Sequence, residues 1–94
     1  MNGLRMKNRA IKRYRRRIDM IDGKIMKLFV KRCQAVELIG RIKNEEGISV
    51  VDKKREQEIL LRIEGLGAGR EVKNFIRKIY ESIFSASYIL EKDE

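Results

Sequence analysis

The sequence predicts an all-α fold of three helices, and three observations indicate it. The chain has no proline and 39% charged residues, a composition that suits long helices better than sheets. Apolar residues in its first half recur at alternating spacings of three and four, as in a coiled-coil seam. Glycines at position 47 and within residues 65–69 divide the chain into three helical segments. Ninety-four residues are expected to form a single domain.

The first predicted helix runs from about Asn8 to about Asn44, and residues 1–8 are expected to be a flexible or frayed basic lead-in. At 1.5 Å per residue this helix is about 50 Å long. Two shorter helices of one small chain cannot cover an apolar seam of that length, so we expect an intertwined homodimer with the long helix at its centre. The seam consists of Ile11, Tyr14, Ile18, Ile21, Ile25, Leu28, Ala35, Ile39 and Ile42.

A short second helix is predicted after a loop. Gly47 is a plausible C-cap for the first helix, and residues 48–51 are expected to form the loop. Asp52 is a good N-cap for a helix from Lys53 to about Leu66.

A third helix of medium length is predicted from about Arg70 to about Lys92. The glycines within residues 65–69 predict a flexible link before it, because they lack the strand-then-helix context of a phosphate-binding loop. The apolar stripe of the third helix consists of Val72, Ile76, Ile79, Ile83, Ala86 and Leu90.

The composition makes several classes of protein improbable. Cys33 is the single cysteine and histidine is absent, so we expect no disulfide framework, no Cys- or His-based metal site and no cofactor. The chain has no apolar run of about 18 residues and no apolar signal-peptide region. We therefore expect no membrane association and a cytoplasmic location.

Positive charge is concentrated in residues 1–17. Eight of the 23 basic residues lie there without any acidic residue, whereas the remaining basic residues nearly balance the 14 acidic ones. A solvated helix end is the favoured interpretation, and a nucleic-acid-binding arm is the alternative. The eight residues are Arg5, Lys7, Arg9, Lys12, Arg13, Arg15, Arg16 and Arg17.

Arg32 occupies a seam position where an apolar residue is expected. A guanidinium on a buried helix face is costly unless an anion pairs with it. Lys43 follows eleven residues later, and it projects within about 20° of Arg32 and about 16 Å along the axis. Two such cations can clamp a small dianion. The alternative interpretation, which the periodicity favours equally, is that the Arg32 side chain extends out of the dimer interface into solvent or pairs with an acid such as Glu56.

Arg15 raises the question of a shared site. It precedes Arg32 by seventeen residues, which is about 25 Å along a helix, so both cannot touch one small ligand from the same chain. In an antiparallel pair of copies, Arg15 of one chain can approach the Arg32–Lys43 region of the other. A functional Arg15 therefore implies a site between subunits.

The ordered pattern of these residues is specific, although no single member is. It closely resembles the all-helical chorismate mutases from about Tyr14 to the C-terminus, over about four-fifths of the chain. The matching segments are Tyr14-Arg15-Arg-Arg-Ile-Asp-Met-Ile-Asp22, then Lys31-Arg32, Gly40-Arg-Ile-Lys43 and Asp52-Lys-Lys-Arg55-Glu56.

The resemblance implies an intertwined dimer with two equivalent sites that convert chorismate to prephenate for phenylalanine and tyrosine synthesis. It assigns Arg15 of the partner chain and Arg32 to the two substrate carboxylates, and Lys43 to the ether oxygen of the breaking bond. Such a rearrangement needs positioning and electrostatic stabilisation rather than a nucleophile or a metal. Arginine suits the carboxylates because it binds them with two hydrogen bonds.

The resemblance also implies roles for residues of the second and third helices. Asp52 and Glu56 would bind the ring hydroxyl, Arg55 would support the carboxylate-binding shell, and Ser87 would lie in the pocket. Glu91 stands where the family often has glutamine, the second donor to the ether oxygen. Because a glutamate donates only when protonated, we expect activity to fall as the pH rises.

Two rival functions remain. An isochorismate pyruvate-lyase of the same fold would use a similar cationic site, and Asp52 with Glu56 favours the mutase over it. A basic dimeric helix that binds DNA is the rival from another class. Arg32 within the seam and the two additional helices argue against it.

Overall fold

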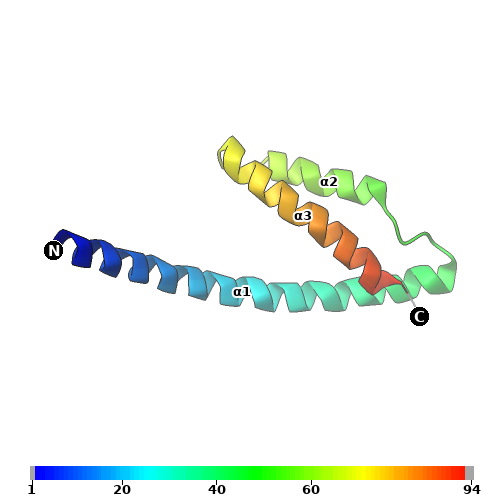
Figure 1. The fold of residues 1–94 in the computed structure, drawn as a ribbon. Coiled ribbons are helices and arrows are strands. Elements are labelled where there is room, and N and C mark those ends of the chain that lie inside the picture. Colours follow the sequence, from blue (N-terminus) through cyan, green and yellow to red (C-terminus); the bar gives the residue numbers. More distant parts are fainter. Residues whose placement is uncertain (1, 93–94) are drawn as a thin grey trace. The chain divides into compact units, whose positions relative to one another are not determined.

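The computed structural model describes residues 2–92, which form three α-helices (Figure 1). They are α1 (Asn2–Glu46), α2 (Lys53–Glu64) and α3 (Arg70–Glu91). No strand occurs within residues 2–92, so the all-α prediction is confirmed. The chain divides into two compact units, one up to Arg32 and one from Cys33 onward.

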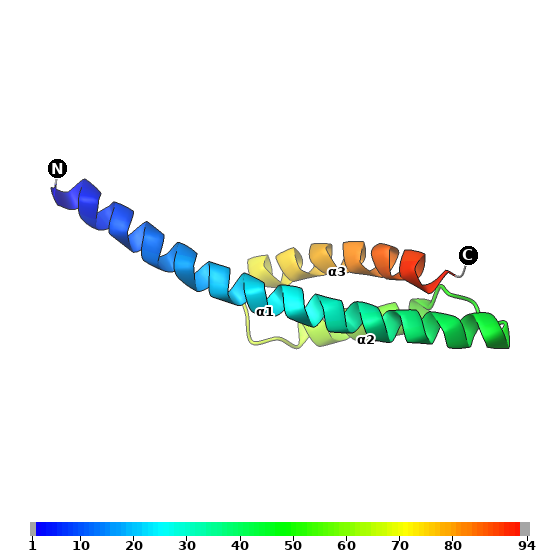
Figure 2. The same cartoon turned by 90° about the horizontal axis from the view of Figure 1, so that it is seen from below.

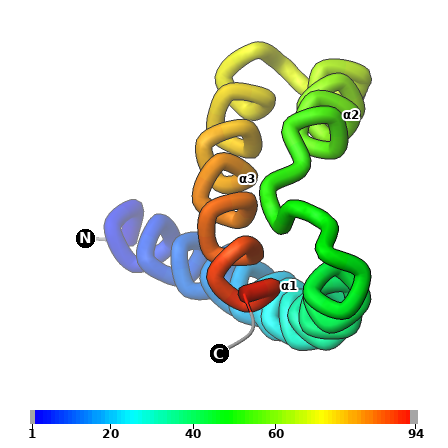
Figure 3. The backbone as a smooth tube through the Cα atoms, turned by 90° about the vertical axis from the view of Figure 1, so that its right-hand side faces the viewer, coloured from blue at the N-terminus to red at the C-terminus, as the bar shows by residue number. Residues whose placement is uncertain are grey.

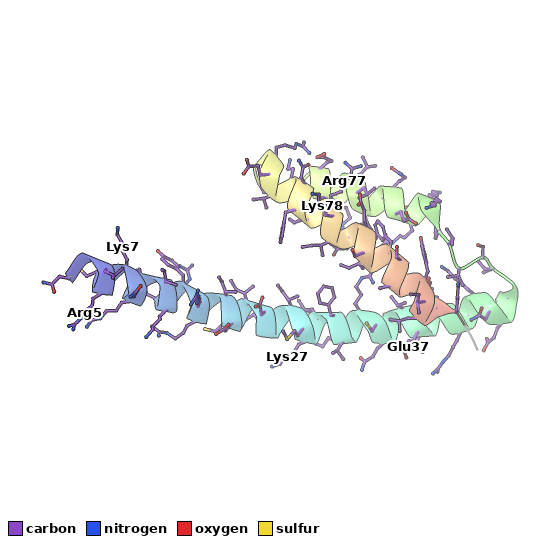
Figure 4. The ribbon with its side chains drawn as sticks, in the orientation of Figure 1. Arg5, Lys7, Lys27, Glu37, Arg77 and Lys78 are labelled. Atoms are coloured by element: carbon purple, nitrogen blue, oxygen red, sulfur yellow. The ribbon has the colours of Figure 1, made fainter. Side chains whose placement is uncertain are left out.

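Helix α1 begins six residues before the predicted start. Residues 2–7 are helical, where the sequence analysis expects a flexible or frayed lead-in. The segment has no proline, and after Gly3 it consists of leucine, arginine, methionine and lysine, which are all good helix formers. Its two basic side chains, Arg5 and Lys7, are exposed and lie on opposite sides of α1 (Figure 4). The guanidinium groups of Arg13 and Arg17 lie 5.4 and 5.6 Å from the ring centre of Tyr14.

The predicted seam of the first unit is uncovered in the single chain. Its six members are between 42% and 63% exposed: Ile11, Tyr14, Ile18, Ile21, Ile25 and Leu28. A stripe of large apolar side chains on one face of a helix is stabilised only when another surface covers it. The single chain thus leaves uncovered the surface that the predicted dimer would bury.

The end of α1 has the geometry that the sequence predicts. Gly47 adopts a positive φ of 67°, which favours glycine because a side chain is rarely tolerated there. The N–H of Ile48 then donates to the carbonyl of Lys43 at 2.8 Å, as in a Schellman C-cap. Residues 48–52 follow outside any helix, which confirms the predicted loop.

Helices α2 and α3 form a hairpin joined by residues 65–69, the link that the glycines predict (Figure 2). Asp52 caps α2, because its Oδ1 accepts from the N–H of Arg55 at 2.9 Å. The two helices lie side by side (Figure 3). Their contact holds a small core of Ile59, Ile63 and Phe84, against which Leu60, Ile76, Tyr80 and Tyr88 pack.

Gly40 allows α1 and α3 to approach closely within the second unit. A Cβ atom at Gly40 would lie 2.6 Å from both the Cα and the carbonyl oxygen of Glu91. Asn44, one turn further along α1, donates to that same carbonyl at 3.0 Å. The backbone at the end of α3 is thus placed directly on residues 40–44.

We predict opposite effects for two glycine-to-alanine substitutions in α1. Gly23→Ala should stabilise the fold by up to about 1 kcal/mol, since alanine favours helices and nothing lies within 4 Å of its new Cβ. Gly40→Ala should destabilise it by about 1–3 kcal/mol, since the Cβ meets backbone. Urea unfolding measures both. Equal stabilisation by the two substitutions would contradict the close contact at Gly40.

Candidate functional site

Lys43 lies at the centre of the candidate site. Its Nζ donates to the carbonyl of Val50 at 3.0 Å and pairs with Oε1 of Glu91 at 2.9 Å. The two paired side chains are only 14% and 7% exposed. Lys43 comes from the last turn of α1, Val50 from the loop and Glu91 from the end of α3. The ammonium of Lys43 therefore ties the end of α1 to the following loop and to the distant end of α3.

The surroundings of Glu91 fix both its backbone and its carboxylate. Its carbonyl accepts from Asn44, its Cα rests on Gly40, and its Oε1 accepts from Lys43. A buried ion pair of this kind persists only when hydrogen bonds and close packing compensate the desolvation of both charges. The structure thus brings together two residues, Lys43 and Glu91, that the sequence analysis assigns to one oxygen of the substrate.

A second group of polar residues forms where α2 begins. The hydroxyl of Tyr88 donates to Oε2 of Glu56 and accepts from the backbone N–H of Asp52 at 3.2 Å. Asp52 is the N-cap of α2, Glu56 lies one turn further along that helix, and Tyr88 faces them from α3. The two predicted hydroxyl-binding acids are therefore adjacent and joined by a phenol.

Burial is the main reason why the pKa of Tyr88 is raised, and its hydrogen bond to Glu56 raises that pKa further. A phenol whose pKa lies above the ordinary 10.0 stays protonated at neutral pH. Tyr88 thus remains a hydrogen-bond donor to the Glu56 carboxylate under physiological conditions.

Two other predicted site residues make local contacts. The guanidinium of Arg55 pairs with Glu58 at 3.1 Å along α2, and its side chain is 57% exposed. The hydroxyl of Ser87 donates to the carbonyl of Ile83 at 2.6 Å within α3. Both residues belong to the same unit as Lys43 and Glu91.

Arg15 and Arg32 lie on α1 in the unit that ends at Arg32. Arg15 is exposed and Arg32 is half-buried. Their predicted binding of substrate carboxylates, and the origin of Arg15 in a second chain, remain predictions.

Three residues that shape this region have no site role predicted from the sequence. Gly40 and Asn44 position Glu91, and Tyr88 joins Asp52 to Glu56. Tyr88 follows Phe84 by four residues and packs against the core, so helical periodicity predicts its burial but not its hydrogen bonds. These hydrogen bonds could be anticipated from the residue type alone, since a buried tyrosine usually needs a partner for its hydroxyl.

Residues 2–92 contain neither a candidate metal site nor a candidate membrane-spanning helix. No group of three or more His, Cys, Asp or Glu side chains there could hold a metal ion. No helix among the same residues is long and apolar enough to cross a membrane.

The arrangement suits electrostatic recognition of a small anionic molecule with a hydroxyl group. Lys43 presents a buried ammonium, which interacts strongly with nearby negative charge because water is largely excluded. Asp52 and Glu56 present carboxylate oxygens, which accept hydrogen bonds from a hydroxyl.

Comparison with known proteins gives one family. The family model described as chorismate mutase type II matches residues 14–92. The chain is 35% identical over 79 residues to the chorismate mutase of Methanocaldococcus jannaschii, covering 83% of this chain and 80% of that protein. It is 33% identical over 88 residues to the bifunctional chorismate mutase/prephenate dehydratase of Aquifex aeolicus, covering 87% of this chain and 24% of that protein. No solved structure gives a significant match.

The raised pKa of Tyr88 predicts a pH effect on stability. Because folding favours the neutral phenol, this contribution is fully present below the ordinary pKa of 10.0 and is lost as the pH rises through the folded-state value. Absorbance of the phenolate should show a step above pH 10.0 that Tyr88→Phe removes. If the step that Tyr88→Phe removes lay at or below pH 10.0, the buried contact with Glu56 would be refuted.

Proposed function

We propose that this chain, which belongs to the chorismate mutase type II family, converts chorismate to prephenate in phenylalanine and tyrosine synthesis. The observation that carries the proposal is the Lys43–Glu91 ion pair inside the matched segment. The resemblance assigns these two residues to the ether oxygen of the substrate. The reaction is an intramolecular rearrangement, so the protein needs to supply only orientation and charge stabilisation.

Lys43 is the proposed donor to the ether oxygen, where negative charge develops as the bond breaks. An ammonium has three N–H groups. In the structure two of them bind Val50 and Glu91, and we assign the third to the substrate. The two protein contacts fix the ammonium before substrate arrives, so little reorganisation is needed in the transition state.

Two arginines are the proposed carboxylate ligands, Arg32 from one chain and Arg15 from its partner. The support for a homodimer is the uncovered apolar seam of α1, from Ile11 to Leu28. A second copy of the same helix would cover that seam. It would also supply Arg15 from outside the chain that holds Lys43.

Asp52 and Glu56 are the proposed ligands of the ring hydroxyl, with Arg55 and Ser87 supporting the pocket. Most of the strongly basic N-terminal segment precedes the matched residues 14–92. We assign it no nucleic-acid partner, because the family match accounts for the two later helices and a DNA-binding arm does not.

Turnover of chorismate tests the proposal directly. The wild-type chain should convert chorismate to prephenate, and Arg32→Ala should lower kcat/KM by about 100-fold or more through loss of a carboxylate ligand. Arg41→Ala is the matched control, because Arg41 is an exposed arginine on the same helix, and it should change little. Isochorismate should give no pyruvate. A chain that consumes isochorismate alone would instead be the lyase.

The glutamate at position 91 predicts a distinctive pH profile. In the structure Glu91 accepts from Lys43. We propose that Glu91 donates to the ether oxygen only when its carboxyl carries a proton, because a carboxylate can only accept. Activity should therefore decline as the pH rises, and Glu91→Gln should flatten the profile because an amide donates at every pH. Glu37→Gln, on an exposed side of α1 (Figure 4), is the control. An unchanged decline in Glu91→Gln would disprove this role.

A further inference from the structure

Tyr88 touches both proposed hydroxyl-binding acids without being one of the expected substrate ligands. Its hydroxyl accepts from the backbone N–H of Asp52 and donates to the carboxylate of Glu56. We infer that Tyr88 is a positioning residue, which holds one oxygen of Glu56 so that the other is presented to the ring hydroxyl of the substrate. The inference rests on the proposed function and adds to it a residue outside the expected ligand set.

The two oxygens of Glu56 have unequal surroundings. Oε2 is bound by Tyr88, a half-buried phenol fixed by packing against the α2–α3 core. Oε1 lies 3.6 Å from Nζ of Lys53, whose side chain is 79% exposed. An exposed lysine contact is weak and readily exchanged. Oε1 is therefore the oxygen that a substrate hydroxyl can take over.

Tyr88 also fixes the start of α2 through the N–H of Asp52. The carboxylate of Asp52 caps the helix by accepting from Arg55 through Oδ1, so its other oxygen, Oδ2, is available to a ligand. One phenol on α3 thus sets the backbone position of one acid and the side-chain rotamer of the other. In the proposed site, each carboxylate would use its remaining oxygen to accept from the substrate hydroxyl.

The expected kinetic consequence is specific. A glutamate that is held in one rotamer before binding avoids the entropy loss of ordering it on the substrate. The ring hydroxyl is not part of the breaking bond, so its binding contributes about equally in the ground state and the transition state. Loss of such uniform binding raises KM and leaves kcat nearly unchanged.

The experiment compares Tyr88→Phe with Tyr80→Phe. Tyr80 lies two turns earlier on α3 and packs against the same core, with its ring 6.1 Å from that of Phe84. Tyr88→Phe should raise KM for chorismate roughly tenfold, the effect of losing a hydrogen bond to a charged group, while kcat changes by less than about twofold. Tyr80→Phe should alter neither constant. Phenylalanine retains the ring that packs, so both variants should fold, and urea unfolding checks this.

A double-mutant cycle tests whether Tyr88 acts through Glu56. If it does, Tyr88→Phe should have almost no effect on KM in a Glu56→Gln background. If Tyr88 had a purely structural role, the effects of Tyr88→Phe and Glu56→Gln on KM would instead multiply in the double variant. Tyr88→Phe would then also lower the free energy of unfolding. Independently, the Tyr88 phenol should ionise at a lower pH in Glu56→Gln, because burial would still raise its pKa but the contribution of the Glu56 carboxylate would be lost.

The outcomes separate this inference from the proposed function. If the wild-type chain does not convert chorismate, the proposed function fails and the inference with it. If the wild type is active but Tyr88→Phe leaves KM unchanged, lowers only kcat, or acts independently of Glu56, the positioning role alone is overturned.

Discussion

The ion pair between Lys43 and Glu91 is the interaction on which the second unit depends. It joins the end of α1 to the end of α3, and the carbonyl of Val50 brings the intervening loop to the same ammonium. Loss of one partner would leave the other charge buried without compensation, which is far more destabilising than loss of a surface pair. Gly40 makes the pair possible, because only a residue without a side chain admits the α3 backbone at that distance.

The same pair connects fold to function. A lysine that is held rigidly and mostly away from water is a poor solubilising group but an effective donor to an oxygen that gains charge. Lys43 therefore has two roles: it is the cation that the fold requires beside Glu91, and it is the proposed electrostatic catalyst. The acids at the start of α2 are arranged in a similar way, because their orientation comes from helix capping and from Tyr88.

The small size of the core explains why the proposal needs a second chain. The buried core of the α2–α3 hairpin comprises Ile59, Ile63 and Phe84. The apolar side chains of α1 up to Leu28 are exposed in the single chain. The single chain thus leaves this apolar stripe uncovered, and the proposed intertwined dimer would bury it.

Sequence signals that act over a few residues predicted the helices, but they did not predict several contacts of the candidate site. Apolar periodicity and the caps at Gly47 and Asp52 predict the element order and most boundaries, because these signals act within a few residues. The start at Asn2 is missed because good helix formers give no stop signal. The contacts of Tyr88 and the carbonyl of Val50 depend on how distant segments pack, which periodicity does not encode. Arg15 and Arg32 come from a family resemblance, and their roles still rest on it.

A mixture of two inactive variants tests the shared site most directly. Arg15→Ala and Arg32→Ala should each be nearly inactive alone, since every site lacks one carboxylate ligand. After co-refolding in equal amounts, half of the dimers should be mixed, and each mixed dimer should contain one intact site, so about a quarter of the wild-type activity should return. A mixture as inactive as its components would contradict a site built from two chains.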